Sequence, residues 1–253
     1  MSRMKPSFPD HFSGHAADYA RYRPDYPEAL FSYLASLVRE RGFAWDCAAG
    51  NGQATAGLAR HFEVVLATDA SARQIESALS LRGVRYAVSP AEKSSLPDGS
   101  VDLVTVAQAL HWFDIPPFFA EVRRVLVPGG VLAVWCYDLL TMAPQIDIPL
   151  NRFYREVVGE YWPPERAIVE RGYASLDFPF EEVRPPGFAM EKEWTLEDLL
   201  GYVRTWSAVR RFMAARGEDP VVALEKDLAP AWGPPRLTRR AVWDLDLRVG
   251  RKR

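Results

Sequence analysis

Two short apolar segments, each ending on an acid, most strongly constrain the fold of this chain. The first ends at Asp46 and leads through the small residues Ala48, Gly50 and Gly52 into a helical pattern, and the second runs up to Asp69. Small residues let a backbone approach a ligand closely, and the amides of a helix's first turn can donate hydrogen bonds to it. An acid after the second segment is placed to accept hydrogen bonds from both hydroxyls of a ribose. The pattern therefore predicts a nucleoside-binding α/β domain.

The loop between these acids favours S-adenosylmethionine over a dinucleotide. A pyrophosphate-binding loop reads Gly-x-Gly-x-x-Gly, whereas the run from Gly50 to Thr55 is Gly-Asn-Gly-Gln-Ala-Thr and lacks the third glycine. Asp46, at the mouth of the loop, would repel a pyrophosphate but can hold the ammonium of a methionine moiety, directly or through water. An NAD-dependent oxidoreductase stays as an alternative, which a binding test with the two cofactors separates.

The middle of the chain alternates short apolar segments with helical patterns. This rhythm predicts right-handed βαβ units, a parallel sheet and ligands at the carboxyl ends of its strands. The expected strands are residues 44–47, 64–68, 84–89, 101–107 and 131–136, the last after a Pro128-Gly129-Gly130 turn. The expected helices are residues 28–41, 53–61, 72–81 and 115–126.

After Tyr137 the alternation stops, and we expect residues 138–175 and 195–235 to cover the active site as a helical lid. A helix is expected over 148–161, and Thr195 is expected to cap a helix with Leu199, Leu200, Val203 and Trp206 on one face. Residues 181–184 and 188–194 are strand candidates, and 241–249 should complete the sheet antiparallel. The expected fold is a Rossmann-like, doubly wound, seven-stranded and mostly parallel sheet in one domain spanning 1–253, with a cofactor-binding core over 28–137.

Composition narrows the partners. The net charge is −2, with 31 basic and 33 acidic residues, so nothing global attracts nucleic acid. Cys47 and Cys136 form no metal-site or disulfide pattern, and no metal is expected. No stretch approaches the ~18 consecutive apolar residues of a membrane span, and the N-terminus has no signal-peptide pattern. We expect a soluble, cytoplasmic protein without membrane contact, and the sequence leaves its oligomeric state open.

Three motifs extend this reading to a family. The loop Asp46-Cys47-Ala48-Ala49-Gly50-Asn51-Gly52 resembles motif I of class I S-adenosylmethionine-dependent methyltransferases, Asp-x-Gly-x-Gly-x-Gly, with alanine in the first glycine position. Pro90-Ala91-Glu92 and the segment 96–104 resemble that family's adenine-covering loop and fourth strand. The run 107–113 and the N-terminal segment 12–27 resemble the type 11-like subgroup related to trans-aconitate methyltransferases.

The resemblance implies a set of cofactor-binding residues along most of the chain from Phe12 to Phe119. Asp69 also fits a helix cap, a role compatible with ribose binding through its other oxygen. Without the resemblance, Glu92 reads as a solvated carboxylate and the Tyr19 to Arg23 segment as a surface helix. Members of the expected set are Tyr19, Arg23, Asp46, Ala48, Gly50, Gly52, Asp69, Ala70, Ala91, Glu92, Ala107, Gln108 and Trp112.

His111 is the candidate catalytic residue because it directly follows the fourth strand, where the methyl group should be transferred. With a pKa near neutrality it would act as a base or hold a carboxylate, although packing beside Trp112 explains it equally well. Trp162, Tyr173 and Trp206 are candidates for the lid or the pocket, with the core as the alternative.

The expected reaction is methyl transfer to a small-molecule acceptor, with a carboxylate suggested by the trans-aconitate subgroup. The run 108–111 lacks the Asn/Asp-Pro-Pro-Tyr/Phe motif of adenine-N6 and glutamine methyltransferases, and neither cysteine follows a proline as cytosine-C5 chemistry requires. A protein that binds S-adenosylmethionine without catalysis is the non-enzymatic alternative. The acceptor and the methylated atom stay open at this point.

Overall fold

The computed structural model describes residues 22–253, and within them a single mixed sheet of eight strands forms the centre of the fold. Seven strands follow one another in the order β3-β2-β1-β4-β5-β8-β6, and β7 pairs with β8 beside this path. The first five are parallel, and β8 runs antiparallel to β5, β6 and β7. The expected Rossmann-like fold with an antiparallel last strand is confirmed. The strands are β1 (Phe43–Cys47), β2 (Val64–Asp69), β3 (Val84–Val88), β4 (Val101–Ala107), β5 (Leu126–Cys136), β6 (Glu181–Val183), β7 (Phe188–Trp194) and β8 (Arg239–Arg251).

Helices cover both faces of the parallel part and form a separate layer above it. Around the sheet lie α2 (Glu28–Ser36), α3 (Gln53–Leu58), α4 (Ala72–Glu76), the 3-10 turn η1 (Leu110–Trp112) and α5 (Ile115–Val125). The rest are α6 (Pro144–Arg152), the π-helical turn η2 (Phe153–Val157), the 3-10 turn η3 (Gly159–Tyr161), α7 (Arg166–Val169), α8 (Leu196–Arg204), α9 (Ser207–Arg216) and α10 (Val221–Trp232).

Neighbouring strand residues point to opposite faces and so build two hydrophobic clusters. Ala44 belongs to the cluster with Leu30 and Phe31 of α2, whereas Trp45 belongs to the cluster with Phe118 of α5. All five side chains are at most 3% exposed. The parallel strands are therefore buried on both faces, and their carboxyl ends are the part of the sheet where a ligand can bind.

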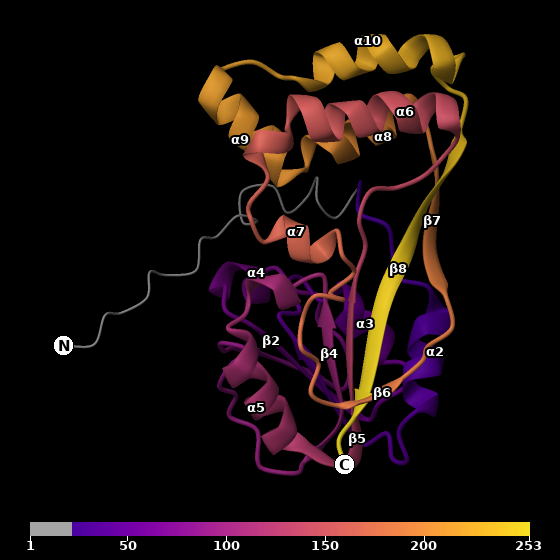
Figure 1. Cartoon of the computed structure of the whole chain (residues 1–253). Helices are drawn as coiled ribbons and strands as arrows, with labels where there is room; N and C mark the ends of the chain where they lie inside the picture. Colours follow the sequence, from indigo (N-terminus) through magenta and orange to yellow (C-terminus); the bar gives the residue numbers. More distant parts are fainter. Residues whose placement is uncertain (1–21) are drawn as a thin grey trace, which may run out of the picture.

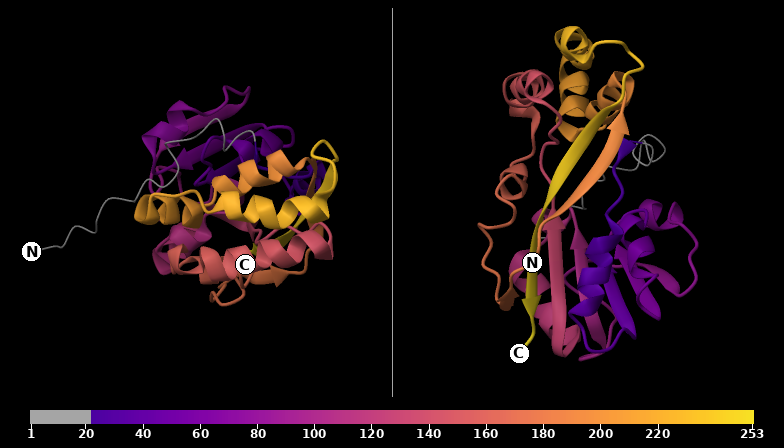
Figure 2. Two further views of the ribbon diagram at one scale, coloured as in Figure 1. Left: turned by 90° about the horizontal axis from the view of Figure 1, so that it is seen from above. Right: turned by 90° about the vertical axis from the view of Figure 1, so that its right-hand side faces the viewer.

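We call residues 144–161 and 196–232 the helical subdomain. In Figure 1 its helices α6, α8, α9 and α10 form a layer above the carboxyl ends of the parallel strands, with α7 between this layer and the sheet. The long strands β7 and β8 run side by side from the sheet to this layer (Figure 2). Thr195 caps α8 as expected, because its hydroxyl accepts from the Asp198 amide while Asp198 accepts from the Thr195 amide.

Several expected helices are shorter in the structure. The helix expected over 28–41 ends at Ser36, where the Arg41 side chain donates to the Ala35 carbonyl. The helix expected over 72–81 ends at Glu76, and it buries no residue that would stabilise a longer one. The segment expected as one helix over 148–161 is helical but irregular. It starts earlier, at Pro144 in α6, and continues through the π turn η2 and the 3-10 turn η3, because the Val158 amide bonds to the Phe153 carbonyl five residues back.

Two further expectations need correction. The Pro128-Gly129-Gly130 turn is instead part of β5, because Gly129 donates to the Lys252 carbonyl and Lys252 donates to the Gly130 carbonyl. Trp206 follows the end of α8 and precedes α9, so it does not continue the α8 stripe, although it is buried at 4% exposure.

Candidate active site

A cavity of about 280 Å³ opens where β1, β2, β3 and β4 end. This is the edge of the sheet at which the sequence predicted a ligand. Nine residues of the expected cofactor set line it: Ala48, Gly50, Asp69, Ala70, Ala91, Glu92, Ala107, Gln108 and Trp112. They come from four separate loops, which the parallel strands bring to one edge.

The loop after β1 has the backbone of a close-approach turn. Ala48, Gly50 and Gly52 have φ angles of +56°, +57° and +91°. Gly52 does not line the cavity; a Cβ there would lie 2.8 Å from the Tyr86 hydroxyl, so this position needs glycine for space as well as for φ. Ala48 adopts a left-handed conformation that costs a residue with a Cβ about 1 kcal/mol or more. The alanine thus keeps the shape of the glycine that motif I usually has here.

Asp69 ties the loop after β1 to the loop after β2. Its Oδ2 accepts from the Gly50 amide at 2.9 Å, and its Oδ1 accepts from the Ser71 amide at 2.8 Å. Both oxygens therefore accept from backbone amides. The N-cap of α4 is Ser71, so the expected capping of that helix by Asp69 is wrong, and ribose binding stays a prediction. A carboxylate offers about four acceptor positions, so this backbone role is compatible with binding ribose hydroxyls.

Asp46 lies beneath the loop and does not line the cavity. It is fully buried, and its two oxygens accept from the Thr55 hydroxyl at 2.6 Å and the Thr105 hydroxyl at 2.9 Å. Burial raises the pKa of Asp46 to about 6, although both hydroxyls oppose this rise. The structure therefore gives Asp46 a place joining β1, α3 and β4, and the direct ammonium contact stays a prediction.

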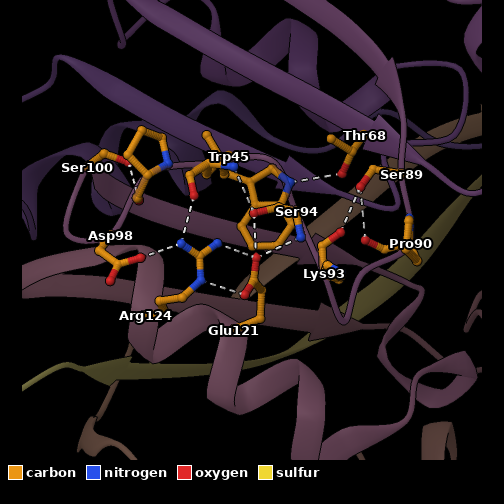
Figure 3. A network of polar contacts seen from close by, with 12 residues as sticks. Trp45, Thr68, Ser89, Pro90, Lys93, Ser94, Asp98, Ser100, Glu121 and Arg124 are labelled. Atoms are coloured by element: carbon orange, nitrogen blue, oxygen red, sulfur yellow. Dashed lines mark hydrogen bonds and ion pairs between the residues drawn. The ribbon is translucent and has the colours of Figure 1, made fainter.

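The segment after β3 is fastened to α5 by an ion pair. The Glu121 carboxylate accepts from the amide and hydroxyl of Ser94 at 2.7 and 2.6 Å and from Arg124, which also binds Asp98 (Figure 3). Nearer the cavity, the Glu92 carboxylate accepts from the Asp114 amide at the start of α5. These contacts hold the Pro90–Glu92 wall of the cavity against α5.

Gln108 and Tyr137 form a wall between the first cavity and a second one. The Gln108 side-chain amide donates to the Tyr137 carbonyl at 2.9 Å and accepts from the Tyr137 amide at 3.0 Å. Gln108 has a φ of +55°, a costly conformation that tends to persist at functional sites. Gln108, Tyr137 and Trp112 line both cavities, so a group bound in one lies next to the other.

The second cavity, of about 90 Å³, lies between the sheet edge and the helical subdomain. Arg23, expected beside the cofactor, lines this cavity and not the first. Its Nη1 donates to the Tyr137 hydroxyl at 2.9 Å, and its guanidinium lies 5.2 Å from the Tyr202 ring centroid. Tyr19 falls outside the described residues.

Arg166 is one of the residues of this cavity that sequence reasoning missed. Its Nε donates to the Tyr154 hydroxyl at 2.7 Å, its Nη2 pairs with Asp138, and its guanidinium carbon lies 4.9 Å from the Trp162 ring centroid. The Arg166 side chain is 16% exposed. Burial alone lowers the pKa of Arg166, but the oxygens of Tyr154 and Asp138 raise it above its ordinary value, so Arg166 remains a cation. The four-residue helix α7 has no periodicity that would have singled it out.

The remaining aromatic candidates divide between cavity and core. Trp162 and Trp206 line the second cavity. Tyr173 is fully buried, and its hydroxyl lies 3.2 Å from the Nδ1 of His111.

His111 lines the second cavity but not the first, and its expected pKa near neutrality is wrong. Burial, followed by the charge of Arg166, lowers the pKa of His111 to about 3. The imidazole is therefore neutral at physiological pH. So weak a base is poorly matched to removing a proton near pH 7, whereas a neutral ring can still orient an acceptor by a hydrogen bond.

Residues 22–253 contain no group of His, Cys, Asp or Glu side chains arranged to hold a metal ion, and no helix among them is long and apolar enough to cross a membrane.

The amino-acid sequence is similar to those of known methyltransferases. Residues 45–134 match a family model described as a methyltransferase domain. A protein of Dictyostelium discoideum, named a methyltransferase with no acceptor in its name, is 36% identical over 229 residues, 89% of this chain and 87% of its own length. A Saccharomyces cerevisiae protein named as an S-adenosylmethionine-dependent methyltransferase is 29% identical over 163 residues, 58% of this chain and 55% of its own.

A solved structure extends the likeness to three dimensions. The protein from Anaeromyxobacter dehalogenans, titled as a type II methyltransferase, is 44% identical and superposes with a TM-score of 0.87. The match covers 91% of this chain and 98% of that one. The similarity therefore includes the helical subdomain as well as the sheet.

Proposed function

The chain belongs to the class I S-adenosylmethionine-dependent methyltransferases, and we propose that it methylates a small molecule bound in the second cavity. The observation that carries the proposal is the shared wall of Gln108, Trp112 and Tyr137 between the two cavities. Methyl transfer needs two reactants aligned and shielded from water, and adjacent cavities under a helical layer provide this arrangement.

The first cavity suits the cofactor. We assign ribose binding to Asp69, the close approach of backbone to Gly50 and Ala48, and the adenine wall to Ala91 and Glu92. Bound S-adenosylmethionine supplies a methyl group on a positively charged sulfur. The Trp112 ring, on the wall of both cavities, is placed to face that charge by cation–π attraction.

We further propose that the acceptor is an anion, and a carboxylate fits best. Arg166 lines the second cavity as a cation and pairs with Asp138 through Nη2, its Nη1 bonds to no acceptor among residues 22–253, and His111 is neutral. A negative acceptor group would accept a charge-assisted hydrogen bond from that Nη1. A carboxylate is already deprotonated near pH 7, so no general base is required and His111 has only to orient it.

We also propose that the protein belongs to the subgroup related to trans-aconitate methyltransferases, which fits an anionic acceptor. We interpret the helical subdomain as a lid over the second cavity, within a single domain. A cytoplasmic location stays a prediction.

One experiment separates the candidate functions. We expect calorimetry to detect S-adenosylmethionine and S-adenosylhomocysteine but not NAD, because the third glycine is absent. Formation of S-adenosylhomocysteine should then be measured with carboxylic acids, phenols and amines. Binding of NAD alone would favour an oxidoreductase, and cofactor binding without turnover on any acceptor would favour a protein that has lost catalysis.

His111→Ala should lower turnover about tenfold and leave cofactor affinity within a few fold. The loss should not change between pH 6 and 9, because a group with a pKa of about 3 is deprotonated throughout that range. The measurement is kcat against pH for the variant and the wild type. His61→Ala is the matched control, since His61 pairs with Glu28 on α2, away from both cavities. If kcat of the wild type titrated near pH 6.5 and kcat of the variant did not, His111 would be a general base.

A further inference from the structure

We propose that Tyr154 is a positioning residue, which holds the Arg166 guanidinium toward the acceptor and so makes the second cavity select anions. The inference rests on the proposed function and adds to it the residue that holds in place the clamp, by which we mean the Arg166 guanidinium and the Trp162 ring beside it. Tyr154 is 6% exposed and lies in the π turn η2.

The Tyr154 hydroxyl sits between a carboxylate and the guanidinium. It donates to the Glu170 carboxylate at 2.6 Å and accepts from the Arg166 Nε at 2.7 Å. Because the hydroxyl hydrogen points to Glu170, a lone pair of the oxygen faces Arg166. The hydroxyl thus fixes one edge of the guanidinium, and Asp138 takes Nη2.

The contacts to Nε and Nη2 leave Nη1 for a ligand. No acceptor among residues 22–253 bonds to the Arg166 Nη1, and Arg166 lines the second cavity. A free arginine side chain loses rotamer entropy when a ligand fixes it. A guanidinium already held at two nitrogens has met most of that cost before the acceptor arrives.

The main chain of Tyr154 places the aromatic side of the same clamp. Its carbonyl accepts from the Trp162 indole at 3.3 Å, and the Tyr154 and Trp162 rings lie 4.9 Å apart. The Arg166 guanidinium lies 5.5 Å from the Tyr154 ring centroid and 4.9 Å from that of Trp162. One residue therefore organises both the cation and an aromatic wall beside it.

The π turn explains why this residue points into the cavity. In η2, Phe153 and Tyr154 are consecutive and both buried, and the Val158 amide bonds to the Phe153 carbonyl five residues back. Such turns widen a helix locally and are frequent at functional sites. Both rings pack on Trp206, with centroids 6.4 Å (Phe153) and 5.7 Å (Tyr154) from it, and the Tyr154 hydroxyl also reaches Arg166 and Glu170.

The test compares charged and neutral ligands on two tyrosine variants. Acetate, benzoate, cinnamate and succinate, each paired with its neutral amide, are titrated by calorimetry into protein saturated with S-adenosylhomocysteine. Tyr154→Phe keeps the ring and removes the hydroxyl. Tyr161→Phe removes a hydroxyl that accepts from Arg216 outside both cavities, and it is the matched control.

For each carboxylate that the wild type binds, we expect the dissociation constant to rise about tenfold in Tyr154→Phe. The dissociation constants of the amides and of S-adenosylhomocysteine should stay within twofold of the wild-type values. Tyr161→Phe should change none of these. Wild-type carboxylate affinity in Tyr154→Phe would overturn the positioning role while leaving the proposed function intact. A wild type that binds no carboxylate more tightly than its amide would overturn the anionic acceptor and this inference together, whereas loss of S-adenosylhomocysteine binding in the wild type would reject the methyltransferase site itself.

Discussion

Asp69→Ala should weaken binding of S-adenosylhomocysteine by about a hundredfold or more. Two charge-assisted hydrogen bonds to ribose, at roughly 1.5 to 3 kcal/mol each, correspond to at least that factor. The variant also releases the Gly50 and Ser71 amides, which Asp69 holds at 2.9 and 2.8 Å. The loop after β1 then loses its connection to the loop after β2. Calorimetry on the purified variant measures the change.

Two further variants separate ribose binding from loop anchoring. Asp69→Asn keeps one acceptor oxygen and loses the charge, so an intermediate loss is expected. Asp227→Ala removes an exposed carboxylate that pairs with Arg152 in the helical subdomain, and it should bind the ligand as the wild type does. An unchanged dissociation constant in folded Asp69→Ala would assign Asp69 to the backbone alone.

The central strands could be predicted closely from the sequence because they are buried on both faces and so appear as short apolar runs. β4 has the expected bounds of Val101–Ala107. β7, which is only partly buried, also has its expected bounds of Phe188–Trp194. The first cavity follows from the same signal, since residues just after parallel strands meet at one edge. Helix ends were less predictable, because α4 buries nothing and the contact that ends α2 comes from Arg41.

The second cavity could not be predicted, because its chemistry depends on contacts between distant parts of the chain. Arg166 gains its role from Tyr154 and Asp138, and nothing in the sequence around α7 shows that these meet. His111 has a low pKa because Arg166 lies close to it and because it is buried. A sequence supplies the ordinary pKa of a histidine, whereas the shift comes from tertiary structure.

Asp46 and Gly52 illustrate the same distinction inside motif I. The motif predicted cofactor contacts for both positions, yet both lie under the loop after β1 and not on the cavity surface. Asp46 binds two threonine hydroxyls, and Gly52 makes room for Tyr86. A spacing pattern gives the residues that a loop requires but not the direction in which each one faces.

Arg166→Gln should lower kcat/KM for an anionic acceptor by about a hundredfold or more and leave S-adenosylhomocysteine affinity within twofold. Arg166 supplies the donor edge at Nη1, and a charge-assisted, largely desolvated contact of this kind is worth several kcal/mol. Glutamine keeps a donor but loses the positive charge. The expected result is therefore a high KM for carboxylates, with little change for neutral acceptors that the enzyme also methylates.

A second substitution protects this test from a folding artefact. Removing Arg166 alone leaves Asp138 without its partner in a site whose burial already raises the pKa of that carboxyl. The Asp138 side chain is 39% exposed, so the loss of stability should stay below the roughly 3 to 5 kcal/mol of a fully buried pair. The double variant Asp138→Asn/Arg166→Gln removes both charges, so its melting temperature should lie closer to that of the wild type while its kcat/KM stays low. If the double variant recovered wild-type kcat/KM on carboxylates, Arg166 would be a structural partner of Asp138, and the anion would have to be bound elsewhere in the cavity.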